Sequence, residues 1–581
     1  MIKTDSKASK NFTLNKLRPI YEMAASAALK LHNEKQAGFD KNNFYDIIFK
    51  YTENSKATLL FESLLKYNPS YKESVGIPDS ILIEEDKIVA KIETLREQIY
   101  GAQQKNDIES IKSLQNELLI EQRRLSAFEE NLSKKYPDYK SNKEKFQQIT
   151  TIKNVKKSLK DDELLVEYFI TDSTCYIFYL TKDLTDVKII EKHSLSDFRE
   201  LISNLRNLLT DINYAKQHPQ EAFQMFQYKA FKIYETYLSH PVLSDKKNLI
   251  IIPDRELNYI PFEILLSKKT DFKNQKYDSL PYLINTHNIR YEYSSTVMTS
   301  YEKSDQLKGN GRIMGFAPEY EKQINYDKLS NEAQNLRTPK ELLLQKNLSN
   351  LEGAKKELEI LKNKMAGDYF FGIKATEKNF KSLNKKEYSV VHLAMHGIVD
   401  LDKPNLSSLV FTENLDSLND NLLYSYEINQ LDFSKVELVV LSACQTGYGK
   451  YELGEGVVSL GRSFMHAGTS SIISTLWELN DQSAVEIMKL FYQNLSNGLP
   501  KNEALRKAKL EYLKKNPGFA SHPFFWAGVI QFGDPSPIKL SYNSATYIYY
   551  IIAVVLFSIS TFGIWYYFKK RKENSKQGQI S

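Results

Sequence analysis

Cysteine is scarce in this sequence: its 581 residues include two cysteines, Cys175 and Cys444. Two thiols cannot build a disulfide framework, and neither belongs to a C-x-x-C pair, so the pattern also argues against structural zinc. The glycine-rich stretch 447–456 lacks both common phosphate-binding motifs. We therefore expect no metal and no other cofactor, and one of the two thiols is a candidate reactive group.

The chain also lacks a strong excess of charge of either sign. Its 78 Lys and Arg residues outnumber its 72 Asp and Glu residues by six, and most of that excess lies in the basic tail 569–581. The rest of the chain is nearly neutral, whereas a nucleic-acid-binding protein usually carries a basic body or stripe. We therefore expect no nucleic-acid partner.

Long uncharged runs are missing from most of the chain, including its start, where no apolar signal-peptide segment follows the early lysines. The exception is residues 547–568, which carry no charge and have tyrosine or tryptophan near both ends. This pattern predicts one transmembrane helix, followed by the basic tail 569–581. We expect a single-pass membrane protein with a C-terminal anchor. The missing signal peptide favours a body in the cytoplasm, whereas the basic tail favours a cytoplasmic tail and a body outside as the alternative.

Helical periodicity dominates the first 150 residues. Apolar residues recur three or four positions apart within 1–78, which predicts an all-α region of paired helices. Residues 79–150 show a narrower apolar seam, which predicts an antiparallel helical hairpin or coiled coil. We interpret residues 79–150 as a spacer packed on its own domain; a surface on the N-terminal helices for an activating protein partner is the alternative interpretation.

From residue 151 onward, short and almost continuously apolar runs alternate with amphipathic helices. Runs such as 388–394 and 436–442 are typical of strands buried on both faces. The alternation predicts an α/β fold with a parallel-rich sheet flanked by helices, and the length of the region predicts two lobes.

Two of these predicted strands end in residues that can carry out chemistry. His396 and Gly397 follow one strand, and Cys444 follows the other. Carboxyl ends of parallel strands build active sites in α/β sheets, and an imidazole there can accept a thiol proton. The backbone N–H groups of Gly397 and Cys444 are candidates for an oxyanion hole. A packing role for Cys444 is the alternative.

Three segments around these residues resemble the CHAT domain, a clan of caspase-like cysteine peptidases related to separase and gingipain. They are SVVHLAMHGIVD (389–400), LVVLSACQTGYGKYELGEGVVSLGRSFMHAGTSSIISTLWELND (438–481) and HPFFWAGVIQFGD (522–534). By position, the resemblance makes Cys444 the nucleophile and His396 the general base. It also implies tetratricopeptide-like helices in 1–78, a degenerate caspase-like lobe in 151–325 and an active lobe in 326–536.

The resemblance implies a bacterial cysteine endopeptidase of a regulated-proteolysis or defence pathway, with a protein substrate that is encoded nearby. Related peptidases place an acidic residue after the nucleophile to select arginine. Asp481 is the first candidate for that role and Glu478 the second, with Trp477 as a wall of the pocket. Helix capping by Asp481 is the alternative. A catalytically silent interaction scaffold at a membrane is the alternative function.

Overall fold

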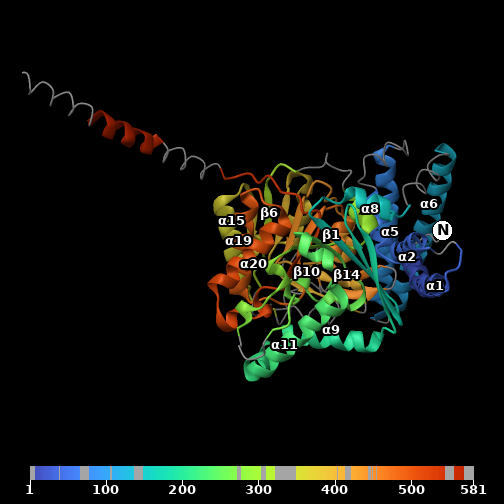
Figure 1. The fold of residues 1–581 in the computed structure, drawn as a ribbon. Helices are drawn as coiled ribbons and strands as arrows, with labels where there is room; N and C mark the ends of the chain where they lie inside the picture. The colour runs from blue at the N-terminus through green and yellow to red at the C-terminus, as the bar shows by residue number, and fades with distance from the viewer. Residues whose placement is uncertain are drawn as a thin grey trace, which may run out of the picture.

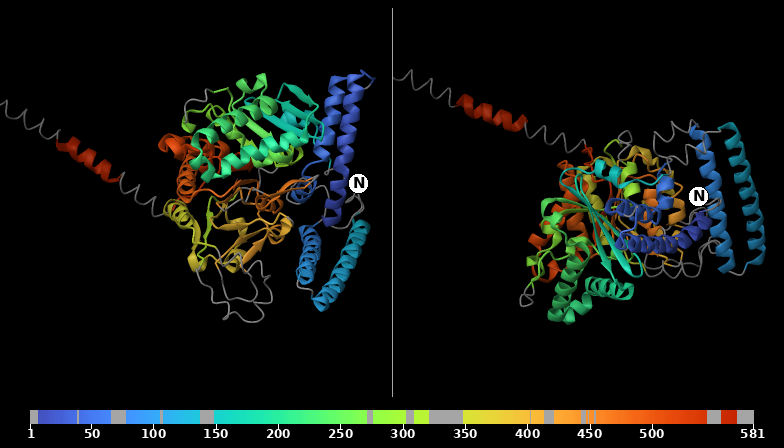
Figure 2. Two further views of the ribbon diagram at one scale, coloured as in Figure 1. Left: turned by 90° about the horizontal axis from the view of Figure 1, so that it is seen from below. Right: turned by 45° about the vertical axis from the view of Figure 1, so that its right-hand side comes forward.

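The computed structural model describes residues 7–37, 40–65, 78–104, 107–136, 148–270, 276–301, 309–320, 348–401, 403–412, 421–442, 447, 449–452, 455–543 and 555–567. Within these ranges the chain folds into a large mixed sheet with helices on both faces, preceded by a group of N-terminal helices (Figures 1 and 2).

The N-terminal helices form two groups. The first contains α1 (Lys7–Asn33), α2 (Lys41–Asn54) and α3 (Thr58–Leu65), and the second is the antiparallel pair α5 (Asp79–Gln104) and α6 (Ile108–Lys135) (Figure 2). A small apolar cluster that includes Ile88, Ile92 and Leu125 joins α5 to α6. The narrow apolar seam of this segment therefore packs one helix of the pair against the other.

One eleven-stranded sheet forms the centre of the molecule, in the order β3-β2-β1-β4-β5-β16-β15-β12-β8-β6-β7. Most neighbouring pairs are parallel; the β1–β2–β3 meander and the β15–β16 pair are antiparallel. The α/β sheet flanked by helices that the sequence predicted is therefore present, as a mixed sheet. Its strands are β1 (Glu163–Ile170), β2 (Thr174–Leu180), β3 (Thr185–Glu191), β4 (Asn248–Ile252), β5 (Asn288–Tyr291), β6 (Ile313–Ala317), β7 (Gly367–Phe371), β8 (Val390–Leu393), β12 (Leu438–Leu441), β15 (Ser471–Thr475) and β16 (Val529–Gly533).

The two faces of the sheet bury different cores. Along β12, Leu438 and Val440 pack in the larger cluster with α9 (Leu195–Thr210), α11 (Pro219–Ile233), α19 (Asp481–Ser496) and α20 (Lys501–Lys515). The alternate residues Val439 and Leu441 pack on the opposite face with α3 and α18 (Leu460–His466). Burial on both faces explains why these strands are continuous apolar runs rather than alternating ones.

The sheet is continuous from one half to the other through β5 and β16, which are paired at Tyr291 and Phe532. Strand β6 precedes residue 325 in the chain, yet it lies between β7 and β8 in the second half of the sheet. The division into lobes at 151–325 and 326–536 stays a prediction.

The predicted transmembrane helix at 547–568, and with it the predicted membrane anchor and membrane localisation, is wrong. No helix in the described ranges is long and apolar enough to cross a bilayer. Residues 547–554 and the basic tail 569–581 lie outside the described ranges.

Candidate active site

The two strands that lead into the predicted dyad are neighbours in the sheet. β8 and β12 run parallel, with His392 opposite Val440 and Leu393 opposite Leu441. The backbone N–H of Ser442 continues the ladder by donating to the carbonyl of Leu393 at 3.0 Å. The described backbone therefore carries both motifs out of the sheet at the same edge, although Cys444 itself lies outside the described residues.

His396, the predicted general base, begins β9 (His396–Ile398) three residues after β8 ends. Its Nε2 lies 2.8 Å from the carbonyl oxygen of Ser349, and its ring lies 4.8 Å from the ring of Tyr320. A carbonyl oxygen can only accept a hydrogen bond, so Nε2 carries the proton and Nδ1 is the acceptor nitrogen. In the neutral ring, Nδ1 is therefore the nitrogen that can accept a proton.

Gly397, the predicted oxyanion donor, lies in β9 opposite Leu409 of β10 (Ser408–Val410). The strand belongs to a small separate sheet that is completed by β11 (Leu422–Tyr424). The structure thus places Gly397 beside His396, and the roles of Gly397 and Cys444 as oxyanion donors stay a prediction. No group of three or more His, Cys, Asp or Glu side chains is arranged to hold a metal ion in the part of the chain that the structure describes.

A buried polar network that the sequence reasoning missed lies beneath these strand ends. Glu357 of α15 (Glu352–Lys364) accepts from His392 Nε2 and from Ser442 Oγ, each at 3.1 Å. The phenol of Tyr492 on α19 donates to His392 Nδ1 at 2.9 Å, and burial raises the pKa of Tyr492 so that the phenol keeps its proton. One carboxylate therefore ties the strand of His396 to the strand of Cys444.

Two predicted pocket residues, Glu478 and Asp481, line one cavity with Glu357 and Ser442. Met395 and Thr475 also line it, so the cavity lies at the carboxyl ends of β8, β12 and β15. The side chains of Glu478 and Asp481 are solvent-exposed. The edge of the sheet beside the dyad motifs therefore carries two exposed carboxylates.

Asp481 is the first residue of α19, and the cap of that helix is its neighbour Asn480. The Asn480 Oδ1 atom accepts from the backbone N–H groups of Gln482 and Ser483, at 3.2 and 3.4 Å. Capping of α19 is therefore assigned to the amide of Asn480. Gly353 of α15 lies close to Asp481. A Cβ atom added at Gly353 would be 3.1 Å from the Cβ atom of Asp481.

Trp477, the third predicted pocket residue, lies elsewhere. Its side chain is 2% exposed, belongs to the larger core cluster and donates from Nε1 to the carbonyl of Phe524 at 2.9 Å. Its ring lies against Gly528, where an added Cβ would come within 2.8 Å of a ring carbon. The structure therefore brings Glu478 and Asp481 to the cavity, while Trp477 packs in the core.

A match to a protein family covers the region that contains these strand ends. Residues 228–534, just over half of the chain, match the CHAT domain. Tetratricopeptide repeat protein 28 of Mus musculus is 33% identical over 128 residues, and that of Homo sapiens is 32% identical. Each match covers 22% of this chain and 5% of the relative, so the chain matches only a small part of these curated relatives.

Among solved structures, two of the Saccharomyces cerevisiae separase-securin complex are similar to this fold. One aligns at 10% identity and a TM-score of 0.38, over 68% of this chain and 32% of that chain. The other aligns at 9% identity and a TM-score of 0.37, over 74% and 34%. The match to the CHAT domain covers more than half of this chain, and the chain therefore belongs to the CHAT domain family.

Proposed function

We propose that this protein is a cysteine endopeptidase in which Cys444 is the nucleophile and His396 is the general base. Nδ1 of His396 takes the thiol proton, and the thiolate attacks the carbonyl carbon of a peptide bond. Backbone N–H groups of Gly397 and Cys444 bind the oxyanion of the tetrahedral intermediate. His396 then protonates the leaving amine, and water hydrolyses the resulting thioester to restore the thiol.

The observation that carries this proposal is the state of His396. Its Nε2 is occupied by the Ser349 carbonyl, which leaves Nδ1 as the basic nitrogen at the end of β8. The neighbouring strand β12 leads into Cys444, and Ser442 on that strand shares the carboxylate of Glu357 with His392. Membership of the CHAT domain family supports the same assignment.

The carboxylates at the cavity support a preference for arginine or lysine before the scissile bond. Glu478 and Asp481 are exposed at its edge, and a guanidinium or ammonium group would pair with them. Glu357 already accepts hydrogen bonds from His392 and Ser442. Its proposed role is therefore to connect β8 to the end of β12 rather than to bind the substrate. The specificity is therefore proposed to depend mainly on Asp481, with Glu478 as the second carboxylate.

The test uses the purified chain and three matched fluorogenic peptides with Arg, Lys or Leu before the reporter group. We expect Arg and Lys peptides to be cleaved and Asp481→Asn to lower their kcat/KM by at least about tenfold, the size of one charge-assisted hydrogen bond. Glu511→Gln, which removes an exposed carboxylate paired with Lys515 elsewhere on the surface, is the control. Preferred cleavage after Leu, or equal loss in both variants, would contradict the proposed specificity.

The same assay separates the peptidase from a silent scaffold. A scaffold would leave all three peptides intact, and Cys444 would not react with a peptidyl electrophile that ends in Arg. A peptidase that rejects these short peptides would still be labelled by the electrophile at Cys444, and labelling would be lost in His396→Ala because the thiol loses its base.

A further inference from the structure

A β-hairpin follows the predicted nucleophile within a few residues. It consists of β13 (Gly449–Glu452) and β14 (Gly456–Ser459), which pair antiparallel. At its start, the backbone N–H of Gly447 donates to the carbonyl of Thr475 at the end of β15, at 2.8 Å. The hairpin is therefore joined at its base to the same sheet edge as the candidate active site.

A buried ion pair from the first helix holds one strand of this hairpin. Arg18 of α1 is 1% exposed, and its Nη2 lies 2.6 Å from Oδ2 of Asp254. The phenol of Tyr451 on β13 donates to the other oxygen, Oδ1 of Asp254, at 2.8 Å. Asp254 therefore uses both oxygens to connect an N-terminal helix to the hairpin; we call Arg18, Asp254 and Tyr451 the clasp.

Electrostatics keep the clasp ionised. Burial alone would raise the pKa of the Asp254 carboxyl, but the attraction of Arg18, together with that of Lys56 and Arg255, outweighs burial and lowers that pKa to about 2. The guanidinium of Arg18 also donates to the carbonyl of Ile170 at 3.1 Å, and it lies 5.9 Å from the ring centre of Tyr451. Arg18 also pairs with Glu22, whose Oε1 lies 2.9 Å from its Nε, and removing Arg18 would take the directly bonded cation away from the buried carboxylate of Asp254.

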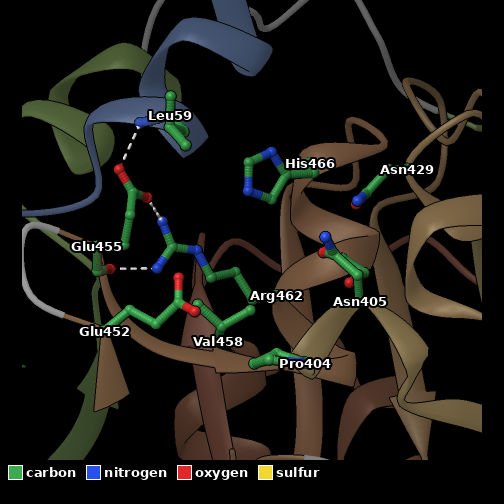
Figure 3. Close-up of a pocket in the computed structure, with 10 residues that line it drawn as sticks. Leu59, Pro404, Asn405, Asn429, Glu452, Glu455, Val458, Arg462 and His466 are labelled. Atoms are coloured by element: carbon green, nitrogen blue, oxygen red, sulfur yellow. Dashed lines mark hydrogen bonds and ion pairs between the residues drawn. The ribbon is translucent and has the colours of Figure 1, made fainter. Parts of the chain in front are cut away.

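A second contact from the N-terminal helices reaches the turn of the hairpin. The backbone N–H of Leu59 on α3 donates to Oε1 of Glu455 at 2.9 Å, while Oε2 of Glu455 pairs with Arg462 on α18 (Figure 3). Glu455 is 4% exposed. Helices α1 and α3 therefore hold the hairpin at two points, on the strand β13 and in the turn that follows it.

These two contacts are not needed to attach the N-terminal helices to the sheet. Apolar residues of α1 and α2 pack against β1 and β2 in a core cluster of their own, which includes Phe44 and Phe178. Lys56, between α2 and α3, also reaches the sheet, through an ion pair of 3.1 Å with Glu167. The buried charges at the hairpin therefore perform a local task, which is to fix the segment that leaves the nucleophile.

We infer that Arg18 and Asp254 are positioning residues for the thiol of Cys444, acting through Tyr451, and that α1 and α3 are parts of the catalytic unit. This inference rests on the proposed peptidase function. It assigns to the first helices a role in the reaction itself, in addition to any surface that they offer to a partner protein.

The experiment measures two properties of each purified variant: the rate at which iodoacetamide alkylates Cys444, read by peptide mapping, and kcat and KM for an Arg peptide. Tyr451→Phe removes one hydroxyl group from the clasp and should lower kcat and the alkylation rate about tenfold, with KM nearly unchanged. Arg18→Met should lower both about 100-fold, because it leaves the carboxylate of Asp254 buried without its cation. Arg18→Lys, which keeps the charge, should recover part of the loss.

Lys509→Met is the matched control, since it removes another buried cation, which pairs with Glu263 at 3.1 Å and has no contact with the hairpin or the clasp. It should lower the melting temperature while kcat per folded molecule stays within about twofold of the wild type. Wild-type alkylation rates and kcat in Tyr451→Phe and Arg18→Met would overturn the inference. If the wild-type chain cleaves no peptide, the proposed function fails, and the alkylation rates of Cys444 still decide whether the clasp positions the thiol.

Discussion

The buried carboxylate of Asp254 makes a definite contribution to stability that depends on pH. Its pKa in the folded chain is about 2, against an ordinary value of 3.8, because burial, which raises the pKa, is outweighed by the attraction of Arg18 together with Lys56 and Arg255. A lowered carboxyl pKa stabilises the fold above the unfolded-state pKa, and this contribution is lost as pH falls through the folded-state pKa. The shift corresponds to about 2 kcal/mol in the free energy of unfolding at neutral pH.

The perturbation is Asp254→Asn, which keeps an oxygen acceptor but removes the charge. From the two pKa values, the wild-type contribution is complete above about pH 5, has begun to fall at pH 3.5 and is reduced by about 2 kcal/mol at pH 2. Other carboxyl groups titrate in the same range, but they are common to both proteins. The difference in unfolding free energy between wild type and variant should therefore shrink as the solution is acidified.

The assay is urea unfolding of both proteins between pH 6 and pH 3.5, followed by fluorescence. We expect the stability advantage of the wild type to decrease over this interval, by roughly half a kcal/mol. An advantage that is constant or that grows toward low pH would refute the reasoning, since it would mean that Asp254 is not held ionised by Arg18.

Three further predictions concern other buried groups. Glu357→Ala leaves two buried donors without an acceptor and should lower the free energy of unfolding by about 3 kcal/mol, measured by urea denaturation, with Glu357→Gln less affected; equal stability of wild type and Glu357→Ala would contradict the network. Burial raises the pKa of Cys175, so alkylation of the native chain followed by peptide mapping should modify Cys444 and spare Cys175; comparable labelling of both would count against this. Gly528→Ala places a Cβ atom within 2.8 Å of the Trp477 ring and should destabilise the fold by about 1–3 kcal/mol. A thermal melt measures this effect, and an unchanged melting midpoint would show that the ring can move aside.

The sheet could be predicted from the sequence because its strands are short apolar runs that are buried on both faces. The same pattern located His396 at the end of a strand, since a polar residue directly after such a run marks the sheet edge. The hydrophobic pattern misled at the C-terminus, where an uncharged run with aromatic ends predicted a membrane span that the described helix over 555–567 does not provide.

The polar contacts around the candidate site could not be predicted, because they join residues that are distant in the chain. The hydrogen bond between Glu357 and Ser442 joins residues 85 positions apart in the sequence, and that between Arg18 and Asp254 joins residues 236 positions apart. Nothing in the local sequence of a helical glutamate or arginine distinguishes a solvated side chain from one that is buried at a strand end. The packing of the helices on the sheet determines whether such a side chain is solvated or buried.

The most direct test of the central claim is peptide cleavage by purified Cys444→Ala beside the wild type. The thiol is the proposed nucleophile, so its removal should lower kcat on an Arg peptide by at least about 10⁴-fold while the far-UV circular dichroism and melting temperature stay close to those of the wild type. Cleavage at the wild-type rate by Cys444→Ala would contradict the cysteine-peptidase account.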